Sequence, residues 1–390
     1  MGDASHHTLL RWRGRMAALV AWLVAAGMTL GSPASAHWQA QAPDHRDQRL
    51  LDVCGPGGRV LHDVAYAMAT RLLEGQTAWT TLELSEHLRA RGEPHPAVRA
   101  WSLRMPRMNR NRAEKGLKSW LASHPEGQRR RCGIASIEDS QRGDVLTMLT
   151  VAVLADLLTP IPKTVRQGQW ITVDAVLHDG AVEGRVVVLG PRGLPRVIPS
   201  SFDPATARVV ARFMADRQGD WLLQVVGTTD AGPKPMLEAQ VRVGPRQAVT
   251  HVPVPGEAAG HGLSDEQAMV AKLNAARVEE GLLPLVVDAQ LTALAREHAK
   301  TMMASGAIGH DMGDGSPPQR LARAGGCAKE VGENVSRATS VTLAHLALWK
   351  SVSHRTNLLH PRYERLGVSA LRDEKGMLWI VQIFAGPCTS

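Results

Sequence analysis

The spacing of apolar residues changes twice along this chain, and that change limits the possible folds more than any other feature. Apolar residues recur at helical spacing from Asp44 to about Leu158, alternate from Thr164 to Val243, and return to helical spacing after Leu263. Helical spacing indicates amphipathic helices, and alternation indicates half-buried strands. With 390 residues and 44% hydrophobic content, the chain is long enough for two or three cores. We therefore predict a multi-domain α+β protein.

Turn residues and composition place the boundaries of these domains. We expect a helix-rich N-terminal domain over residues 45–160 and an antiparallel, immunoglobulin-like β-sandwich over residues 164–244, where Gly turns separate short strands. Residues 245–262 are rich in Pro, Gly and Ala without a period, which is typical of a linker. The last domain, residues 263–387, opens with the capping-box sequence Ser264–Gln267 and ends in a predicted hairpin.

The first 36 residues have the pattern of a secretory signal. Three Arg residues precede an apolar run, Met16–Leu30, and Pro33–Ala36 supplies small residues for cleavage. The run has about fifteen residues, whereas a spanning helix needs roughly twenty. We predict that residues 1–36 are removed, that no transmembrane segment remains, and that the mature protein is secreted or periplasmic.

The cysteines fit an oxidising compartment, where an even number tends to pair. Two lie before residue 160 and two lie after residue 320, and none forms a CxxC motif. Four cysteines allow three connectivities. Pairing within each region joins the cysteines that lie closest in the sequence. We therefore expect two disulfides, Cys54–Cys132 and Cys327–Cys388, rather than a zinc ribbon or a redox site.

Composition also limits the partners. Only five residues are Phe or Tyr, which leaves few stacking platforms for single-stranded nucleic acid, and we expect no nucleic-acid partner. Between Arg99 and Arg131, ten Lys or Arg residues stand against two Glu residues. A solvated helix face is the usual explanation for such a run. The alternative is docking on anionic envelope polymers, lipopolysaccharide or phospholipid headgroups.

The last domain contains an ordered series of recognisable residues: Asn274, Arg277, Gly281, Leu285, His298-Ala299, Met302, His310, Gly332-Glu333-Asn334, Trp349, Ser351, His354-Arg355, Asn357, Gly367-Val368, Trp379 and Gln382-Ile383-Phe384. In this order and spacing, residues 263–387 resemble the bacterial branch of the CAP superfamily. These are secreted SCP-like proteins related to cysteine-rich secretory proteins, antigen 5 and plant pathogenesis-related proteins. The resemblance implies a three-layer α-β-α sandwich.

Better-known eukaryotic members line a cleft with two His and two Glu residues, and this chain matches part of that set. His310 corresponds to the first His, and Glu333 corresponds to the first Glu. Ser351 stands near the expected second Glu, and Trp379 stands at the expected second His, so both of those groups are absent. His354, in the His-Arg pair of bacterial members, is expected to point into the same cleft.

A cluster of His310, Glu333 and His354 allows three roles. The three side chains are candidate zinc ligands, and zinc is the one cofactor that the pattern allows. They are also candidates for acid-base catalysis, although no GxSxG or HExxH motif supplies the usual companions of a hydrolase, and we assign no catalytic residue. The third role is a structural hydrogen-bond cluster.

These alternatives favour a binding protein over an enzyme. We expect a cell-envelope or extracellular protein that binds a lipid, glycan or protein ligand in the His/Glu-lined cleft. The alternative is a metal-dependent, zinc hydrolase or protease-like enzyme that uses the same cleft. The sequence predicts no oligomeric state.

Several other residues have simpler interpretations. Trp349 and Trp379 are expected in the core, and His298 is expected at the core edge with bonds to backbone. Arg355 is interpreted as a surface or carboxylate-paired side chain, and Asn357 as a loop cap. Within residues 331–359 we expect a lead-in followed by one helix over residues 342–352.

A possible repeat links the two ends of the chain. Trp120 and His124 echo Trp349 and His354, and Cys132-Gly133 echoes Leu366-Gly367. Residues 45–158 are therefore either a degenerate copy of the CAP domain or a plain helical domain with chance similarity.

Overall fold

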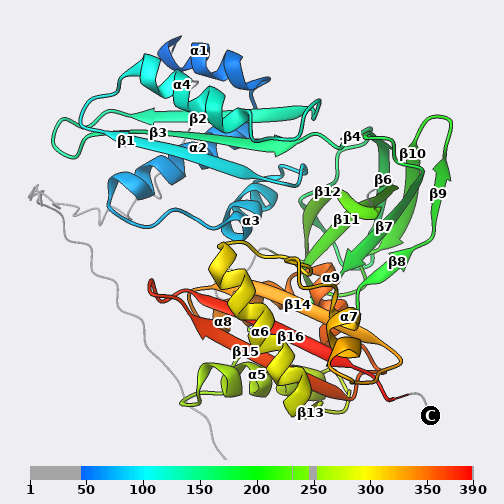
Figure 1. Cartoon of the computed structure of the whole chain (residues 1–390). Coiled ribbons are helices and arrows are strands. Elements are labelled where there is room, and N and C mark those ends of the chain that lie inside the picture. The colour runs from blue at the N-terminus through cyan, green and yellow to red at the C-terminus, as the bar shows by residue number, and fades with distance from the viewer. Residues whose placement is uncertain (1–44, 231, 246–252, 389–390) are drawn as a thin grey trace, which may run out of the picture. The chain divides into compact units, whose positions relative to one another are not determined.

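The computed structural model describes residues 45–230, 232–245 and 253–388 (Figure 1). These residues belong to one compact unit of the chain. The predicted signal segment, residues 1–36, lies outside the described residues. No helix within the described ranges is long and apolar enough to span a membrane.

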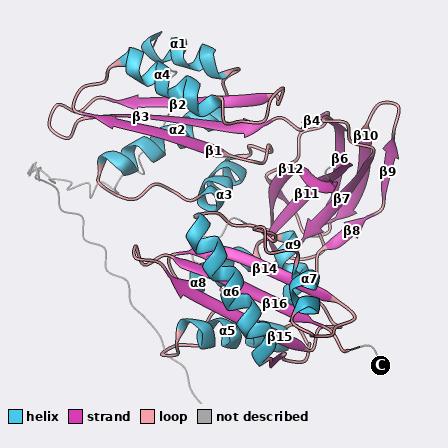
Figure 2. Ribbon diagram, viewed as in Figure 1, coloured by secondary structure: helices cyan, strands magenta, loops and turns pink. Residues whose placement is uncertain are grey.

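The N-terminal domain is a three-stranded antiparallel sheet covered by helices (Figure 2). The sheet has the order β1-β3-β2. The elements, in chain order, are α1 (His45–Cys54), α2 (Arg59–Leu73), α3 (Thr81–Arg91), β1 (Arg99–Met105), α4 (Arg110–Leu121), β2 (Arg130–Ile137) and β3 (Asp144–Ala152).

The helices of this domain cover both faces of its sheet. Leu50 of α1 and Leu117 of α4 pack with Met148 on one face. Leu61 of α2 and Leu88 of α3 belong to the core on the other face. The domain is therefore more than helix-rich: it contains a sheet whose strand β3 is buried at every position and has no polar alternation.

The central domain is the predicted β-sandwich, formed by sheets of order β4-β6-β10-β9 and β5-β12-β11-β7-β8. Its buried residues, including Val173, Val188 and Leu223, form one core between the sheets. The first strand starts at Ala155, earlier than the predicted boundary at residue 164. The strands are β4 (Ala155–Leu157), β5 (Thr164–Val165), β6 (Trp170–Leu177), β7 (Glu183–Leu189), β8 (Arg196–Ile198), β9 (Ser200–Asp203), β10 (Arg208–Met214), β11 (Gly219–Thr229) and β12 (Gly232–Val243).

The C-terminal domain has a sheet of order β13-β15-β16-β14. Strand β13 pairs with β15 in parallel, and the other pairings are antiparallel. The elements are α5 (Asp265–Glu279), β13 (Val286–Val287), α6 (Ala289–Ser305), α7 (Pro317–Arg323), β14 (Val331–Ala338), α8 (Val341–Trp349), α9 (Val352–Leu358), β15 (Arg365–Arg372) and β16 (Leu378–Ala385).

Two cores separate the three layers of this domain. Helices α5, α8 and α9 bury residues such as Leu273 and Leu348 against Phe384 on one face of the sheet. Helices α6 and α7 bury Leu291 and Leu321 on the opposite face. This arrangement is the expected α-β-α sandwich.

One glycine sets the distance between α6 and the sheet. A side-chain carbon at Gly367 would lie 2.1 Å from the carbonyl carbon of Leu291, so only glycine lets the helix approach β15 this closely. Gly133 of β2 has the same relation to α2, with the corresponding distance 2.3 Å to the carbonyl carbon of Leu61. In both domains a glycine in a strand therefore allows a helix to approach the sheet closely.

The predicted linker is only partly a linker. Residues 246–252 lie outside the described residues, whereas residues 253–262 pack on the last domain. His345 bonds through Nε2 to the Pro255 carbonyl oxygen at 2.7 Å, and Gly256 donates its N–H to Glu279 at 2.9 Å. These contacts extend the last domain upstream of residue 263.

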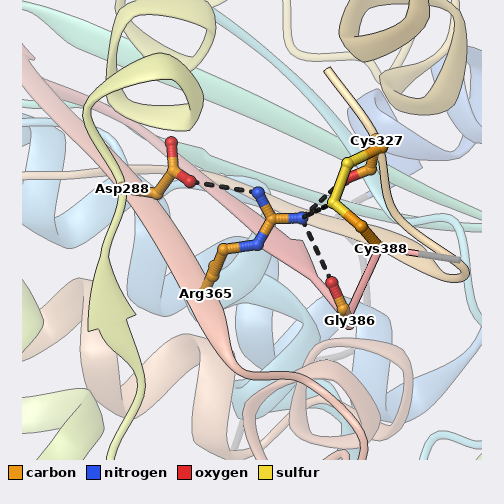
Figure 3. Close-up of a disulfide and its surroundings, with 5 residues drawn as sticks. All are labelled: Asp288, Cys327, Arg365, Gly386 and Cys388. Carbon is orange, nitrogen blue, oxygen red and sulfur yellow. Dashed lines mark hydrogen bonds and ion pairs between the residues drawn. A yellow bond between two sulfur atoms is a disulfide. The ribbon is translucent and has the colours of Figure 1, made fainter. Parts of the chain in front are cut away.

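Both predicted disulfides are present, Cys54–Cys132 and Cys327–Cys388. The second joins the segment before β14 to the C-terminal end of the domain. Figure 3 shows that Arg365 lies against this disulfide, donating to the carbonyl oxygens of Cys327 at 2.5 Å and Gly386 at 3.2 Å. Its other terminal nitrogen donates to Asp288 at 3.1 Å. Because Asp288 caps α6, one guanidinium links that helix start to the disulfide.

Residues 331–359 differ from the predicted lead-in and single helix. The Gly-Glu-Asn motif lies in strand β14, and the following helical region is divided into α8 and α9. Helix α8 ends at Trp349, whose carbonyl oxygen accepts a hydrogen bond of 2.5 Å from Arg355. A side chain thus satisfies a backbone group at the helix end, and α9 begins at Val352.

Candidate functional site in the C-terminal domain

His310 lies in the loop between α6 and α7. Gly306 ends α6 in the left-handed conformation, and Asp311 then accepts hydrogen bonds from the N–H groups of Gly313 and Gly315. These bonds form a local turn. It leaves the side chain of His310 56% exposed.

The loop is fastened to α6 by His298, which is fully buried. Its Nδ1 lies 2.7 Å from Asp314, and its Nε2 lies 2.8 Å from the carbonyl oxygen of Gly309. The prediction of a core-edge, backbone-bonded imidazole describes half of this arrangement. The bond to the Asp314 side chain was not expected, and it also attaches the loop that carries His310 to α6.

Glu333 lies behind His310 on strand β14, and its side chain is only 1% exposed. His310 Nδ1 bonds to Glu333 Oε1 at 3.0 Å. The other carboxylate oxygen accepts a hydrogen bond from Arg320 of α7. Both oxygens of this buried carboxylate therefore have cationic or imidazole partners.

Arg320 was not identified from the sequence, although it connects most of the site. Besides Glu333, its guanidinium donates to the carbonyl oxygens of His310, at 2.9 Å, and Gly315. It also lies 3.5 Å from Asp314. The sequence offered one signal for Arg320. Ser316 and Pro317 predict the start of a short helix, and Arg320 lies beside Leu321, which is buried in that helix.

His354 approaches the site from α9 and lines the same cavity as His310. Burial lowers the pKa of His354 to about 4, and repulsion from His310 acts in the same direction. His354 is therefore neutral at physiological pH. The arrangement brings the two imidazoles to one cavity and leaves the Glu333 carboxylate behind His310.

Amide side chains hold α9 against β14. Asn334 donates to the carbonyl oxygen of His354 at 3.2 Å, and Asn357 donates to the carbonyl oxygen of Glu333 at 3.0 Å. Asn357 also donates to Asn334 at 2.9 Å. Asn357 is therefore not a loop cap as interpreted from the sequence: it joins the helix that carries His354 to the strand that carries Glu333.

The cavity between these residues has a volume of about 760 Å³. One part of its lining is polar, with His310, His354 and Ser351. Another part is apolar and includes Ile308, Val335, Ala347, Leu348 and Met377. Residues 78–81 of the N-terminal domain, which include Trp79, contribute to the lining as well.

The residues in this site do not match an ordinary zinc centre. Across the described ranges, no group of three or more His, Cys, Asp or Glu side chains is arranged to hold a metal ion. The proposed ligand Glu333 is already ion-paired with Arg320, and a guanidinium beside a carboxylate opposes a dication there. The His310, Glu333 and His354 set therefore does not fit zinc in this arrangement.

Arg355 differs most from its sequence interpretation. It is buried rather than exposed, and it pairs with carbonyl oxygens rather than with a carboxylate. Burial lowers its pKa to about 9. Its guanidinium lies 4.3 Å from the centre of the Trp349 ring, in the core position expected for that Trp.

The comparisons with known proteins agree with this architecture. The model of the CAP family, described as the cysteine-rich secretory protein family, matches residues 270–384. Residues 270–384 form a CAP domain. A curated relative, the uncharacterized protein YkwD of Bacillus subtilis, is 30% identical over 119 residues, or 30% of this chain. The match spans 46% of that relative, so the chain covers about half of its length.

Solved structures of CAP-type proteins are also similar to this chain. An extracellular protein containing an SCP domain from Bacillus anthracis is 19% identical, with 60% of this chain and 67% of that chain covered and a TM-score of 0.29. A cysteine-rich secretory protein from Staphylococcus aureus is 15% identical, with 60% and 84% covered and a TM-score of 0.28. The assignment of the CAP domain rests on the family match and the Bacillus relative.

Proposed function

We propose that this is an exported binding protein whose CAP-domain cavity holds a small amphipathic ligand. The observation that carries the proposal is the mixed lining of one cavity, which combines apolar side chains such as Val335 and Leu348 with two imidazoles. Ligand sites commonly combine an apolar lining with a few placed polar groups. The two disulfides support export, because disulfides persist in oxidising compartments.

The two imidazoles offer hydrogen-bonding nitrogens to a polar group of the ligand. Glu333 engages Nδ1 of His310, which leaves Nε2 of the exposed ring for a ligand. His354 is neutral and therefore able to donate or accept one hydrogen bond. A long-chain fatty acid satisfies both parts of the cavity, with its carboxylate at the imidazoles and its chain along the apolar lining.

The hydrolase alternative has less support. Glu333, the one carboxylate among the three candidate zinc ligands, is already paired with Arg320, which leaves two imidazoles for a metal. Acid-base catalysis by His310 alone would still need a nucleophile close to the ring. The binding function therefore accounts for the arrangement with fewer additional groups.

A fluorescent fatty acid, dansyl-undecanoic acid, tests the proposal by titration. Ile308 lines the cavity and is 47% exposed, so Ile308→Asp should keep the fold and weaken binding about tenfold by placing a charge beside the ligand chain. His310→Ala should weaken binding through loss of the polar contact.

Leu343→Asp is the matched control, because Leu343 is 50% exposed and does not line the cavity. Equal binding by the unmodified protein, Ile308→Asp and Leu343→Asp would refute the proposal. Hydrolysis of an ester or peptide probe that is lost with a chelator and with His310→Ala would establish the enzyme alternative instead.

A further inference from the structure

The N-terminal domain has the strand arrangement of the CAP domain without its candidate site. The order β1-β3-β2 corresponds to β14-β16-β15, and helices cover both faces in each case. Gly367 lies opposite Ile383, which lies opposite Glu333. In the N-terminal sheet, Gly133 lies opposite Leu149, which lies opposite Ala100. The position equivalent to Glu333 is therefore Ala100.

An alanine at this position means that the N-terminal domain cannot repeat the chemistry of the His310–Glu333 pair. Ala100 packs beside the core formed by α2 and α3. A different feature distinguishes this domain. Residues 99–131 contain ten basic and two acidic residues, whereas residues 45–98 and 132–158 together contain seven basic and eleven acidic residues. The positive charge is concentrated in β1, α4 and the start of β2.

Helix α4 concentrates this charge on its solvent side. Ala113, Leu117 and Leu121 bury the opposite side against the core. The exposed positions of the helix contain cations and small polar residues but no acid: Asn111, Arg112, Lys115, Lys118 and Ser119. We call these positions the α4 face.

The nearest acid does not neutralise the α4 face. Glu114 is shared between Arg49, at 3.1 Å, and Lys118, at 2.7 Å. Within the described residues, no carboxylate forms an ion pair with Arg112 or Lys115. A shared carboxylate therefore leaves a net positive charge along the helix.

Basic residues continue the charge beyond both ends of α4. Arg107 is exposed just before the helix. Arg99 donates to Ser123 just after the helix, at 3.0 Å to its carbonyl oxygen and 3.1 Å to its hydroxyl group. Arg130 is close enough to His124 to influence its ionisation. Twelve helical residues extend about 18 Å, so the positive surface is elongated.

We propose that the α4 face, together with Arg99, Arg107 and Arg130, binds an extended polyanion such as a phosphate-bearing polymer of the cell envelope. An elongated row of cations matches a linear array of anions and gains affinity by releasing their counterions. A bilayer fits less well, because the α4 face presents no large hydrophobic side chain for insertion. This binding is independent of the cleft proposed in the CAP domain.

Long-chain inorganic polyphosphate is a suitable probe, with the full-length mature protein in a fluorescence-anisotropy titration. Arg112→Glu/Lys115→Glu should weaken binding by tenfold or more and make the remaining affinity less dependent on salt concentration. Both side chains are exposed, so the fold should be kept. Circular dichroism checks this directly.

The control is Lys329→Glu/Lys375→Glu, which makes the same change in net charge at two exposed positions of the CAP domain. It should retain the affinity for polyphosphate within about twofold, since distant surface charges are screened. Equal weakening by both double variants would reduce the effect to net charge and overturn the proposal. Binding to phosphatidylglycerol vesicles but not to polyphosphate would also overturn it, in favour of a membrane surface.

Discussion

Arg320 and Glu333 form a buried ion pair in which the guanidinium bonds one carboxylate oxygen while His310 bonds the other. Their side chains are 5% and 1% exposed. The pair joins the short helix α7 to strand β14, and Arg320 also holds the His310 loop through two carbonyl oxygens. The same contacts therefore stabilise the domain and position the imidazole that lines the cleft.

Removing the arginine should be severely destabilising. We expect Arg320→Leu to lower the free energy of unfolding by about 3–5 kcal/mol, because it leaves a buried carboxylate without its main counter-charge. Urea denaturation measures this change. The double variant Arg320→Leu/Glu333→Leu should recover part of the loss, since it removes the unpaired charge as well. A single variant that costs less than about 1 kcal/mol would show that the pair contributes little to the fold.

Arg355 should be important for the attachment between α9 and the loop that follows β7. Its Nη1 donates to the carbonyl oxygen of Gly190 at 2.8 Å, and its Nε donates to that of Trp349. Arg355→Ala should lower stability by about 2–4 kcal/mol and expose the Gly190 loop to proteases, because several charged hydrogen bonds are lost together. Arg355→Lys should not restore it, since an ammonium group cannot reproduce the planar fork.

Arg192 provides the matched control for this prediction. Its ion pair with Glu280 connects the same loop to the CAP domain, but its side chain is 49% exposed. We expect Arg192→Ala to cost less than about 1 kcal/mol, as exposed ion pairs usually do. Equal losses for the two variants, by thermal unfolding and limited proteolysis, would contradict the role assigned to Arg355.

The C-terminal disulfide should stabilise the CAP domain more than the arginine beside it. Replacing both Cys327 and Cys388 by Ser should lower the free energy of unfolding by about 2–4 kcal/mol, because the bridge closes a loop with a sequence separation of 61. Arg365→Ala should cost less, since the disulfide still joins the segments. Calorimetry of the two variants under oxidising conditions compares them, and a larger loss for Arg365→Ala would contradict the prediction.

The sequence revealed features that depend on local pattern. The sandwich was predictable because its strands alternate, and the disulfides were predictable because the cysteines fall into two separated regions. The strand that carries Glu333 was harder to predict: its Gly-Glu-Asn motif identified the family but not its secondary structure. Strand β3 has no alternation because it is fully buried, so only the similarity to the C-terminal hairpin pointed to it.

The missing parts of the site depend on contacts that leave no mark in the sequence. Arg355 bonds to the carbonyl oxygen of Gly190, 165 positions away, and every residue has such an oxygen. Arg320 likewise shares its charge between a carboxylate and two carbonyl oxygens. The sequence predicted the imidazoles and the carboxylate as candidates, whereas the cation that pairs with the carboxylate was visible only in the fold.

The low pKa of His354 makes a prediction about acid stability. The imidazole has a pKa of about 4 when folded, against an ordinary value of 6.5. Above pH 6.5 the ring is neutral in both the folded and the unfolded state, so its protonation does not lower the free energy of unfolding. Between pH 6.5 and 4 the unfolded chain binds a proton that the folded protein does not, so stability falls as the pH falls. Below pH 4 both states are protonated and this loss stops growing.

The expected loss is about 1–3 kcal/mol across that window, reduced by solvent because the ring lines an open cavity. Urea denaturation at a series of pH values should therefore show a shallower decline for His354→Gln than for the unmodified protein. His310→Gln should raise the pKa of His354, because it removes the nearby imidazole that repels the proton. Titration of the His354 ring by NMR measures both effects, and a folded pKa close to 6.5 would show that the ring is solvated rather than held in the cleft.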